Sequence, residues 1–146
     1  MSVVKSKQEI GELAVITAAA ELAGYTVQIC TNENNFPKRF RWAITNKIVD
    51  CAVDINIFLN AANSVLVEYP EDFRMRQSYQ KKALATTHSL IAAIKVAHRT
   101  FHIEASRREC WGRKIYKVQN LIRSWIRSDK ERYTKELKAK GFDITG

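Results

Sequence analysis

The sequence has few of the residues that end or bend helices, with only 2 prolines and 5 glycines among 146 residues. A β-sandwich of this length needs many more turn signals, so this scarcity argues against one. Long stretches rich in Ala, Leu, Ile, Lys, Arg and Glu favour a few long helices instead. Because 46% of the residues are hydrophobic, the chain can form a true core, and its length suits one domain.

Cysteines are also few, and Cys30, Cys51 and Cys110 are far apart in the sequence. No CxxC pair exists, so the spacing suggests neither a disulfide framework nor a zinc site. Each cysteine has apolar neighbours, which is typical of buried thiols in a reducing compartment.

Targeting signals are missing as well. Lys5, Lys7 and Glu9 precede no long apolar segment of the kind a signal peptide has. We find no run that approaches the ~18 apolar residues of a membrane span. The sequence therefore predicts a cytoplasmic protein with no membrane partner.

The sequence contains no enzyme motif and no glycine-rich phosphate loop. His98 and His102 have the i,i+4 spacing of a metal-binding pair, but no third ligand is evident. The simpler interpretation places His98 half-buried near a helix end, where a partial positive charge is favourable. Asp50 and Asp54 share a helical face, which alone is a poor argument for hydrolysis. We predict no catalytic residues, metal or cofactor. An enzyme using Cys110 or the histidines is a third alternative, which needs those residues clustered in one pocket.

Apolar residues recur at helical spacing in four segments, predicted as helices over residues 7–30, 39–68, 71–100 and 106–132. The first is apolar almost all round, as expected for a helix that is deeply buried or shared between the core and an oligomer interface. Short connections favour an all-α, antiparallel up-down-up-down four-helix bundle over residues 1–133. Residues 134–146 are predicted to form a charged tail, in which Gly141 ends any helix.

Local signals mark two helix starts. Pro70 suits the first turn of the third helix, and Glu71 and Asp72 complement the helix dipole there. Ser106 and Glu109 fit a capping box at the start of the fourth. In the fourth helix an apolar stripe contains Trp111 and Trp125, which we predict to lie in the core or at a subunit contact, with Trp42 able to do the same.

Charge is distributed unevenly along the chain. Residues 1–73 hold 6 Lys+Arg and 9 Asp+Glu, a net charge of −3. Residues 74–146 hold 18 Lys+Arg and 6 Asp+Glu, a net charge of +12, and together they give +9. A surface this basic usually binds a polyanion or an acidic protein.

The cations of the third and fourth helices form the main candidate binding surface: Arg74, Arg76, Lys81, Lys82, Arg107, Arg108, Arg113, Lys114, Lys117, Arg123 and Arg127. Phosphate contacts by such residues would be salt-dependent and largely independent of sequence. The alternative is a solvated cationic face that keeps the protein soluble. We favour binding because the fourth helix lacks the alternating acids that form i,i+4 pairs.

A second basic spot consists of Lys38, Arg39 and Arg41, beside Phe36 and Phe40. Exposed aromatic rings could stack on unpaired bases there. The simpler interpretation is that both phenylalanines close the end of the bundle core.

Known proteins share part of this pattern. Asn35-Phe36-Pro37-Lys38-Arg39-Phe40 precedes a long apolar helix that ends near Ala61-Ala62-Asn63, and the last helix contains the run 121–129, LIRSWIRSD. With the opening residues 1–7 and the segment 25–30, these features resemble a family of small four-helix-bundle proteins. It includes the accessory variability determinants of diversity-generating retroelements and proteins encoded by intervening sequences of bacterial ribosomal RNA genes. The family often has a Leu-Gly step where this chain reads Ala43-Ile44-Thr45-Asn46, and the segment beyond Tyr133 has no counterpart.

The resemblance implies a homo-oligomeric ring, specifically a homopentamer with a central pore and a basic outer surface. It also implies non-catalytic binding of a reverse transcriptase, its template RNA, or a DNA or RNA/DNA hybrid, in support of mutagenic reverse transcription. The alternative is a self-assembling structural or protein-interaction module that binds no nucleic acid.

Overall fold

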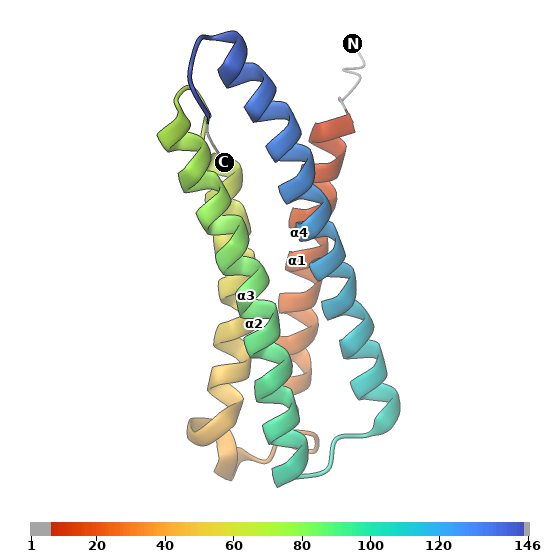
Figure 1. Cartoon of the computed structure of the whole chain (residues 1–146). Helices are drawn as coiled ribbons and strands as arrows, with labels where there is room; N and C mark the ends of the chain where they lie inside the picture. Colours follow the sequence, from red (N-terminus) through yellow and green to blue (C-terminus); the bar gives the residue numbers. More distant parts are fainter. Residues whose placement is uncertain (1–6, 145–146) are drawn as a thin grey trace, which may run out of the picture.

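The computed structural model describes residues 7–144, with side chains from residue 11 onward. Over this range the chain is all-α and contains no strand. Four long helices form the fold: α1 (Lys7–Thr31), α2 (Asn46–Ser64), α3 (Pro70–Thr100) and α4 (Ala105–Ala139). They pack side by side in a bundle-like arrangement, and each helix runs opposite to the one before it (Figure 1).

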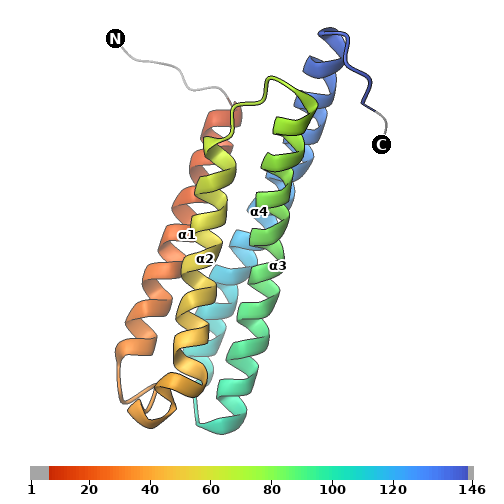
Figure 2. The same cartoon turned by 90° about the vertical axis from the view of Figure 1, so that its left-hand side faces the viewer.

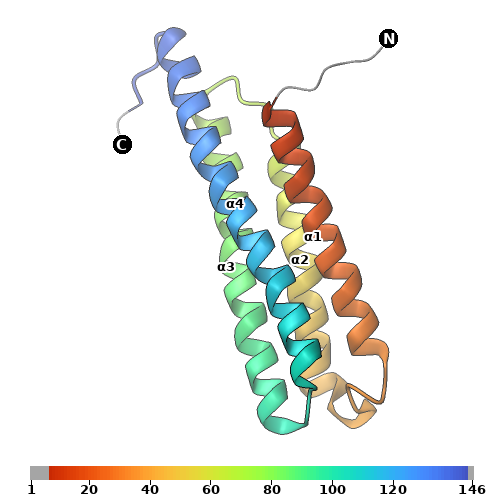
Figure 3. The same cartoon turned by 90° about the vertical axis from the view of Figure 1, so that its right-hand side faces the viewer.

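Each helix packs mainly against two others. α1 contacts α2 and α4, while α3 contacts α2 and α4, so the four helices occupy the corners of a square. Figure 2 shows α1, α2 and α3 from one side, and Figure 3 shows α4 between α1 and α3 from the other. The bottom of Figure 1, called the lower end below, holds the α1–α2 and α3–α4 connections. The upper end holds the α2–α3 connection and both ends of the described chain.

The main core runs along the axis between the helices. Its largest fully buried side chains include Leu22, Ile48, Leu59, Leu90 and Trp111. Trp111 is 0% exposed and Trp125 5% exposed, so their predicted core positions are confirmed. Burial of this apolar surface is the main favourable term that holds the helices together.

Aromatic rings close the lower end of this core. Phe36 is buried, and its ring centroid lies 5.1 Å from that of Phe101 and 6.0 Å from the ring centroid of Trp111. Phe40 stacks on Phe101 at 5.2 Å. The prediction that Phe36 and Phe40 close the bundle core is therefore confirmed.

The predicted helix over residues 39–68 is wrong at both ends. A 3₁₀ turn (η1, Lys38–Phe40) and a π-helical turn (η2, Arg41–Thr45) precede α2, and α2 itself ends at Ser64. In η2 the Asn46 backbone N–H donates to the Arg41 carbonyl oxygen. This wider turn buries Ile44 and Thr45 and leaves Trp42 85% exposed, so the expected packing of Trp42 is wrong.

The start of α3 is the one predicted from Pro70. The Asp72 carboxylate accepts hydrogen bonds from the backbone N–H groups of Tyr69 at 2.9 Å and Glu68 at 3.0 Å. By contrast, α4 begins at Ala105 after Glu104 and has no side-chain cap, so the predicted capping box of Ser106 and Glu109 is wrong.

α4 also continues through Ala139, beyond its predicted end near residue 132. Tyr133 and Leu137 are buried against Phe73 in a small second core, on which Phe142 and Ile144 also pack. Gly141 ends the helix at φ +91°, and the Phe142 N–H donates to the Leu137 carbonyl oxygen at 3.0 Å. This is a Schellman ending, so the predicted role of Gly141 is confirmed, whereas residues 134–144 are part of the fold and not a separate charged tail.

Over Gly11–Thr31, α1 is long and apolar enough to cross a membrane by length and composition alone, contrary to the expectation from the sequence. Core helices of soluble proteins have the same properties. One side of α1 is buried in the bundle through Val15, Ala19 and Leu22.

Candidate nucleic-acid and partner interface

The two helices α3 and α4 hold long segments that are free of acidic residues. No Asp or Glu occurs between Asp72 and Glu104, and none occurs between Glu109 and Asp129. The second segment spans roughly 27 Å of helix at ~1.5 Å per residue. Since α3 and α4 are neighbours, both segments contribute cations to adjacent surfaces of the molecule.

Seven of the predicted residues are exposed on these helices, and together they are called the cationic face: Arg74, Lys81, Lys82, Arg113, Lys117, Arg123 and Arg127. Arg123 and Arg127 line an open groove with Leu84 of α3, while Arg74, Lys81 and Lys82 line a second depression on α3. The structure thus places most of the predicted cations where a large anionic partner can reach them.

Few of these cations have a carboxylate partner. Arg74 pairs with Glu71 at 3.3 Å, and both side chains are exposed. The nearest side-chain acceptors of Arg123 and Arg127 are neutral, the amide oxygen of Asn120 at 3.5 Å and the hydroxyl of Ser124 at 3.4 Å. Among residues 11–144, no other member of the cationic face forms an ion pair, so its charge is available to phosphates or to an acidic protein.

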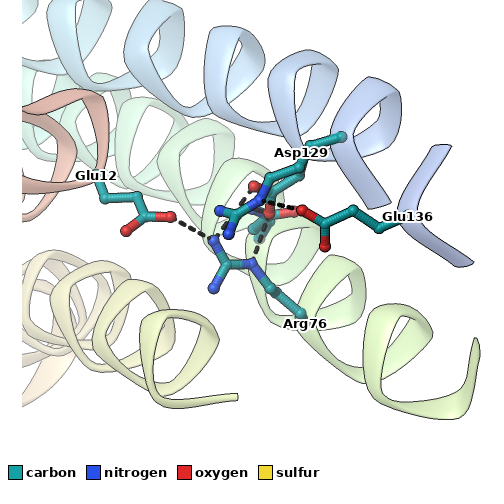
Figure 4. A network of polar contacts seen from close by, with 6 residues as sticks. Glu12, Arg76, Asp129 and Glu136 are labelled. Atoms are coloured by element: carbon teal, nitrogen blue, oxygen red, sulfur yellow. Dashed lines mark hydrogen bonds and ion pairs between the residues drawn. The ribbon is translucent and has the colours of Figure 1, made fainter. Parts of the chain in front are cut away.

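Arg76 does not belong to this face, and its predicted outward position is wrong. Its side chain is buried, and its Nε donates to Asp129 Oδ2 at 2.6 Å. Its Nη2 donates to Glu12 Oε1 at 2.8 Å and to Asp129 Oδ1 at 3.2 Å. Figure 4 shows Glu12 and Asp129 directed at the Arg76 guanidinium. A buried charge must be paired, so Arg76 serves the fold.

Gln80 completes this buried ion cluster, which consists of Glu12, Arg76, Gln80 and Asp129. Its Nε2 donates to Asp129 Oδ2 at 2.8 Å. The guanidinium of Arg76 also lies 5.0 Å from the Trp125 ring and 5.4 Å from the Tyr133 ring. Burial lowers the pKa of Arg76, but its bonds to Asp129 and Glu12 outweigh this and leave the pKa raised. The cluster ties α1, α3 and α4 together near the upper end.

Three other predicted cations on α4 are half-buried, and two of them have structural contacts. The Nε of Arg108 donates to the Ile103 carbonyl oxygen at 3.0 Å, and Arg107 is also half-buried. Lys114 lies 5.2 Å from the centre of the Tyr25 ring. Burial raises the pKa of Tyr25 to about 12, so its phenol stays neutral and the contact with Lys114 is a cation–π interaction.

The second basic spot lies at the lower end. Lys38 and Arg39 are exposed, and the Arg39 guanidinium lies 4.9 Å from the centre of the Phe40 ring. Arg41 is half-buried and reaches Glu33 at 3.9 Å. The loop after α3 adds His102 and the last turn of α3 adds Arg99 to this end, both exposed.

Two lysines that the sequence argument missed extend the cationic face. Lys130 and Lys138 line a groove with Arg74 between α3 and the last turns of α4. Lys138 was missed because residues 134–146 were expected to lie outside the bundle, and Lys130 because it lies in the mixed-charge run of residues 129–132, where the apolar pattern fades. The helical spacing of Tyr133 and Leu137 after Asp129 is the signal that could have placed them.

The His98–His102 pair has no third metal ligand beside it in the part of the chain that the structure describes. The His98 and His102 rings lie 6.3 Å apart, and residues 11–144 contain no group of three or more metal-ligating side chains. His98 is half-buried as expected, but burial and the charge of Arg108 lower its pKa, which opposes the positive charge expected there. Cys30 is buried, and Cys51 and Cys110 are half-buried free thiols.

The chain matches no protein-family model, no curated protein and no solved structure.

Proposed function

We propose that this protein is a non-catalytic accessory of a mobile-element reverse transcriptase of the diversity-generating retroelement type. It binds template RNA, the reverse transcriptase, or both through the cationic face. The carrying observation is the pair of acid-free segments in α3 and α4, in which Arg113, Lys117, Arg123 and Arg127 form no ion pair with any carboxylate among residues 11–144. Such a surface neutralises phosphates and releases counterions on binding. The family resemblance supplies the identity of the partner.

The proposal includes assembly of an antiparallel four-helix bundle into a ring, with five subunits as the resemblance implies. The support is the outward side of α1, where exposed residues follow each other at alternating steps of four and three: Leu13, Thr17, Ala20, Gly24, Val27 and Thr31. This is the spacing of a coiled-coil contact, and it carries no charge. Small side chains such as Ala20 and Gly24 allow a second helix to approach closely.

A triple substitution tests the cationic face. In the full-length protein, Arg113→Gln, Lys117→Gln and Arg123→Gln should weaken RNA binding and reduce the slope of log affinity against log salt by about 2, as expected for the loss of three single-strand phosphate contacts. The control variant Lys135→Gln and Lys140→Gln loses two charges at exposed positions outside the proposed face. Equal RNA binding and co-purification of the triple variant and this control would show that the face is wrongly placed.

Assembly and partner are tested on the parent protein. Light scattering should give a mass near five subunits, and Ala20→Glu should lower it, whereas Ser89→Glu, exposed on α3, should not. Co-purification with a reverse transcriptase encoded beside this gene should survive nuclease treatment if the two proteins touch directly. Loss on nuclease treatment would mean that RNA bridges them.

The alternative function is a self-assembling interaction module without nucleic-acid binding. The uncharged stripe from Leu13 to Thr31 on α1 favours it as well, since it explains assembly without using the cationic face. Genomic context distinguishes the two. A neighbouring reverse-transcriptase gene with a template/variable repeat pair supports the accessory function, and an isolated gene or one within a ribosomal RNA intervening sequence supports the alternative.

A further inference from the structure

Trp42 is the most exposed of the large hydrophobic side chains in the described chain. It is 85% exposed, whereas Trp111 is 0% and Trp125 is 5% exposed. Its position is set by the π-helical turn η2, in which the Asn46 N–H reaches back to the Arg41 carbonyl oxygen. Single π-helical turns are rare and occur frequently at functional sites.

The turn η2, which carries Trp42, is packed against the rest of the fold. Ile44 and Thr45 of the same turn are buried, and η2 packs against both α2 and α3. Phe40, directly before the turn, stacks on Phe101 at 5.2 Å, and Phe101 packs on the buried Phe36 at 5.1 Å. The indole of Trp42 is therefore carried by a turn that is packed into the fold at the lower end, and the indole itself faces solvent.

Only positive charge flanks this indole in the sequence. Residues 34–49 contain Lys38, Arg39, Arg41 and Lys47 and no Asp or Glu. Glu33 reaches Arg41 at 3.9 Å and partly neutralises it. Lys38 and Arg39 are exposed and have no ion pair among residues 11–144, and the Phe40 ring holds the Arg39 guanidinium at 4.9 Å.

We propose that the lower end is a binding site for single-stranded RNA, in which Trp42 stacks on an unpaired base while Lys38 and Arg39 contact the flanking phosphates. An exposed aromatic ring beside cations is the combination that single-strand-binding proteins use, because every base has a flat face and every nucleotide a phosphate. A duplex keeps its bases stacked inside and offers Trp42 nothing to stack on. This inference rests on the proposed function, and it adds the strandedness of the RNA and the residue that recognises it.

Intrinsic fluorescence of the full-length protein gives a direct test. The probes are a 12-nucleotide oligo(U) and a 12-base-pair RNA duplex. Because the other two tryptophans are buried, oligo(U) should quench the emission of Trp42 on binding, and the duplex should not. Trp42→Ala should weaken oligo(U) binding about tenfold, within the range for loss of one stacked base. Its effect on duplex binding should be under twofold.

Three further variants separate stacking from charge and from folding. Trp42→Phe should keep most of the affinity, since it keeps a flat ring. Lys38→Gln should reduce the salt slope by about 1 and leave the quenching in place. Leu66→Ala replaces another highly exposed side chain, at the upper end, and should change neither the salt slope nor the quenching. A thermal unfolding midpoint equal to that of the parent shows that Trp42→Ala folds.

Each other outcome has a definite meaning. If the parent binds RNA through the cationic face and Trp42→Ala binds oligo(U) equally well, the inference fails and the proposed function stands. If the parent binds neither probe at low salt, the inference fails together with the RNA-binding part of the proposed function, and co-purification with the reverse transcriptase tests the remaining part. If Trp42→Ala loses only the reverse transcriptase, Trp42 contacts that protein and the RNA site is wrong.

Discussion

The two ends of the bundle are stabilised by different interactions, aromatic packing at the lower end and a buried ion cluster at the upper end. At the lower end Phe36, Phe101 and Trp111 pack edge to face, and one buried hydrogen bond joins Trp111 to Thr26. At the upper end the axis is occupied by the ion cluster of Arg76 and Asp129. Loss of one methylene group from apolar packing costs about 1 kcal/mol, whereas loss of one partner of a buried charge costs about 3–5 kcal/mol. We therefore expect the upper end to be more sensitive to single polar substitutions.

Asp129→Ala should have the largest effect because it leaves Arg76 buried with only Glu12 as a charged partner. The expected loss in the free energy of unfolding is about 3 kcal/mol, measured by urea denaturation. Glu131→Ala removes an exposed acid of the same helix and should cost under ~0.5 kcal/mol. Combining Asp129→Leu with Arg76→Met should recover only part of the loss, because Gln80 and Glu12 still lose their partners. Equal stability of Asp129→Ala and Glu131→Ala would show that the cluster does not stabilise the upper end.

Thr26→Val tests the polar contact of the lower end. The Trp111 Nε1–H donates to Thr26 Oγ1 at 3.0 Å, and both residues are fully buried. Valine keeps the shape and removes the acceptor, so the indole N–H loses its partner at a cost of about 1–3 kcal/mol. Thr100→Val, exposed at the end of α3, should be nearly neutral. If Thr26→Val lowered the free energy of unfolding more than Asp129→Ala does, the lower end would be the more sensitive of the two ends.

Cys30 makes the lower end sensitive to alkaline pH. Burial raises the pKa of its thiol from 9.0 to about 12. Between these values the unfolded chain loses the thiol proton while the folded chain keeps it, so the stabilisation is complete below pH 9 and falls as the pH rises. The parent should lose about 1.4 kcal/mol more than Cys30→Ala between pH 8 and pH 10. Parallel pH profiles of the two proteins in urea denaturation would contradict this.

Gly141→Ala should have the smallest effect. The residue has φ +91°, and a side chain there costs about 1 kcal/mol. The matched substitution Gly112→Ala lies on an exposed face of α4 with open space for the added methyl, and should stabilise the protein by up to ~1 kcal/mol. Thermal unfolding of the two variants should therefore shift in opposite directions.

The sequence predicts the apolar parts of this fold better than the polar ones. Trp111, Trp125 and Phe36 lie at helical spacing among other hydrophobic residues, and their burial follows from that pattern. Arg76 lies on the same stripe as Phe73, Gln80 and Ala83, all buried, but its charge led to an outward assignment. Its partner Asp129 is 53 residues away, and only the packing of α3 on α4 brings them together.

Only part of the candidate site could be predicted from the sequence. The exposed cations from Arg113 to Arg127 follow directly from the charge pattern and the helix. The exposure of Trp42 could not be predicted, because the pattern was taken as one regular helix from residue 39. A single π-helical turn changes which side of the segment faces the core, and no local signal in Arg41–Thr45 marks it.

The bonded residues of the ion cluster are far apart in the sequence, and this separation affects the folding kinetics. The Arg76–Glu12 bond joins α3 to α1 across 64 residues, so it does not exist in a hairpin of two sequential helices, whereas the Arg76–Asp129 bond lies within the α3–α4 hairpin. A bond that forms only after the transition state acts mainly on the rate of unfolding. We therefore expect the bond to Glu12 to lengthen the lifetime of the native state while leaving the rate of folding nearly unchanged.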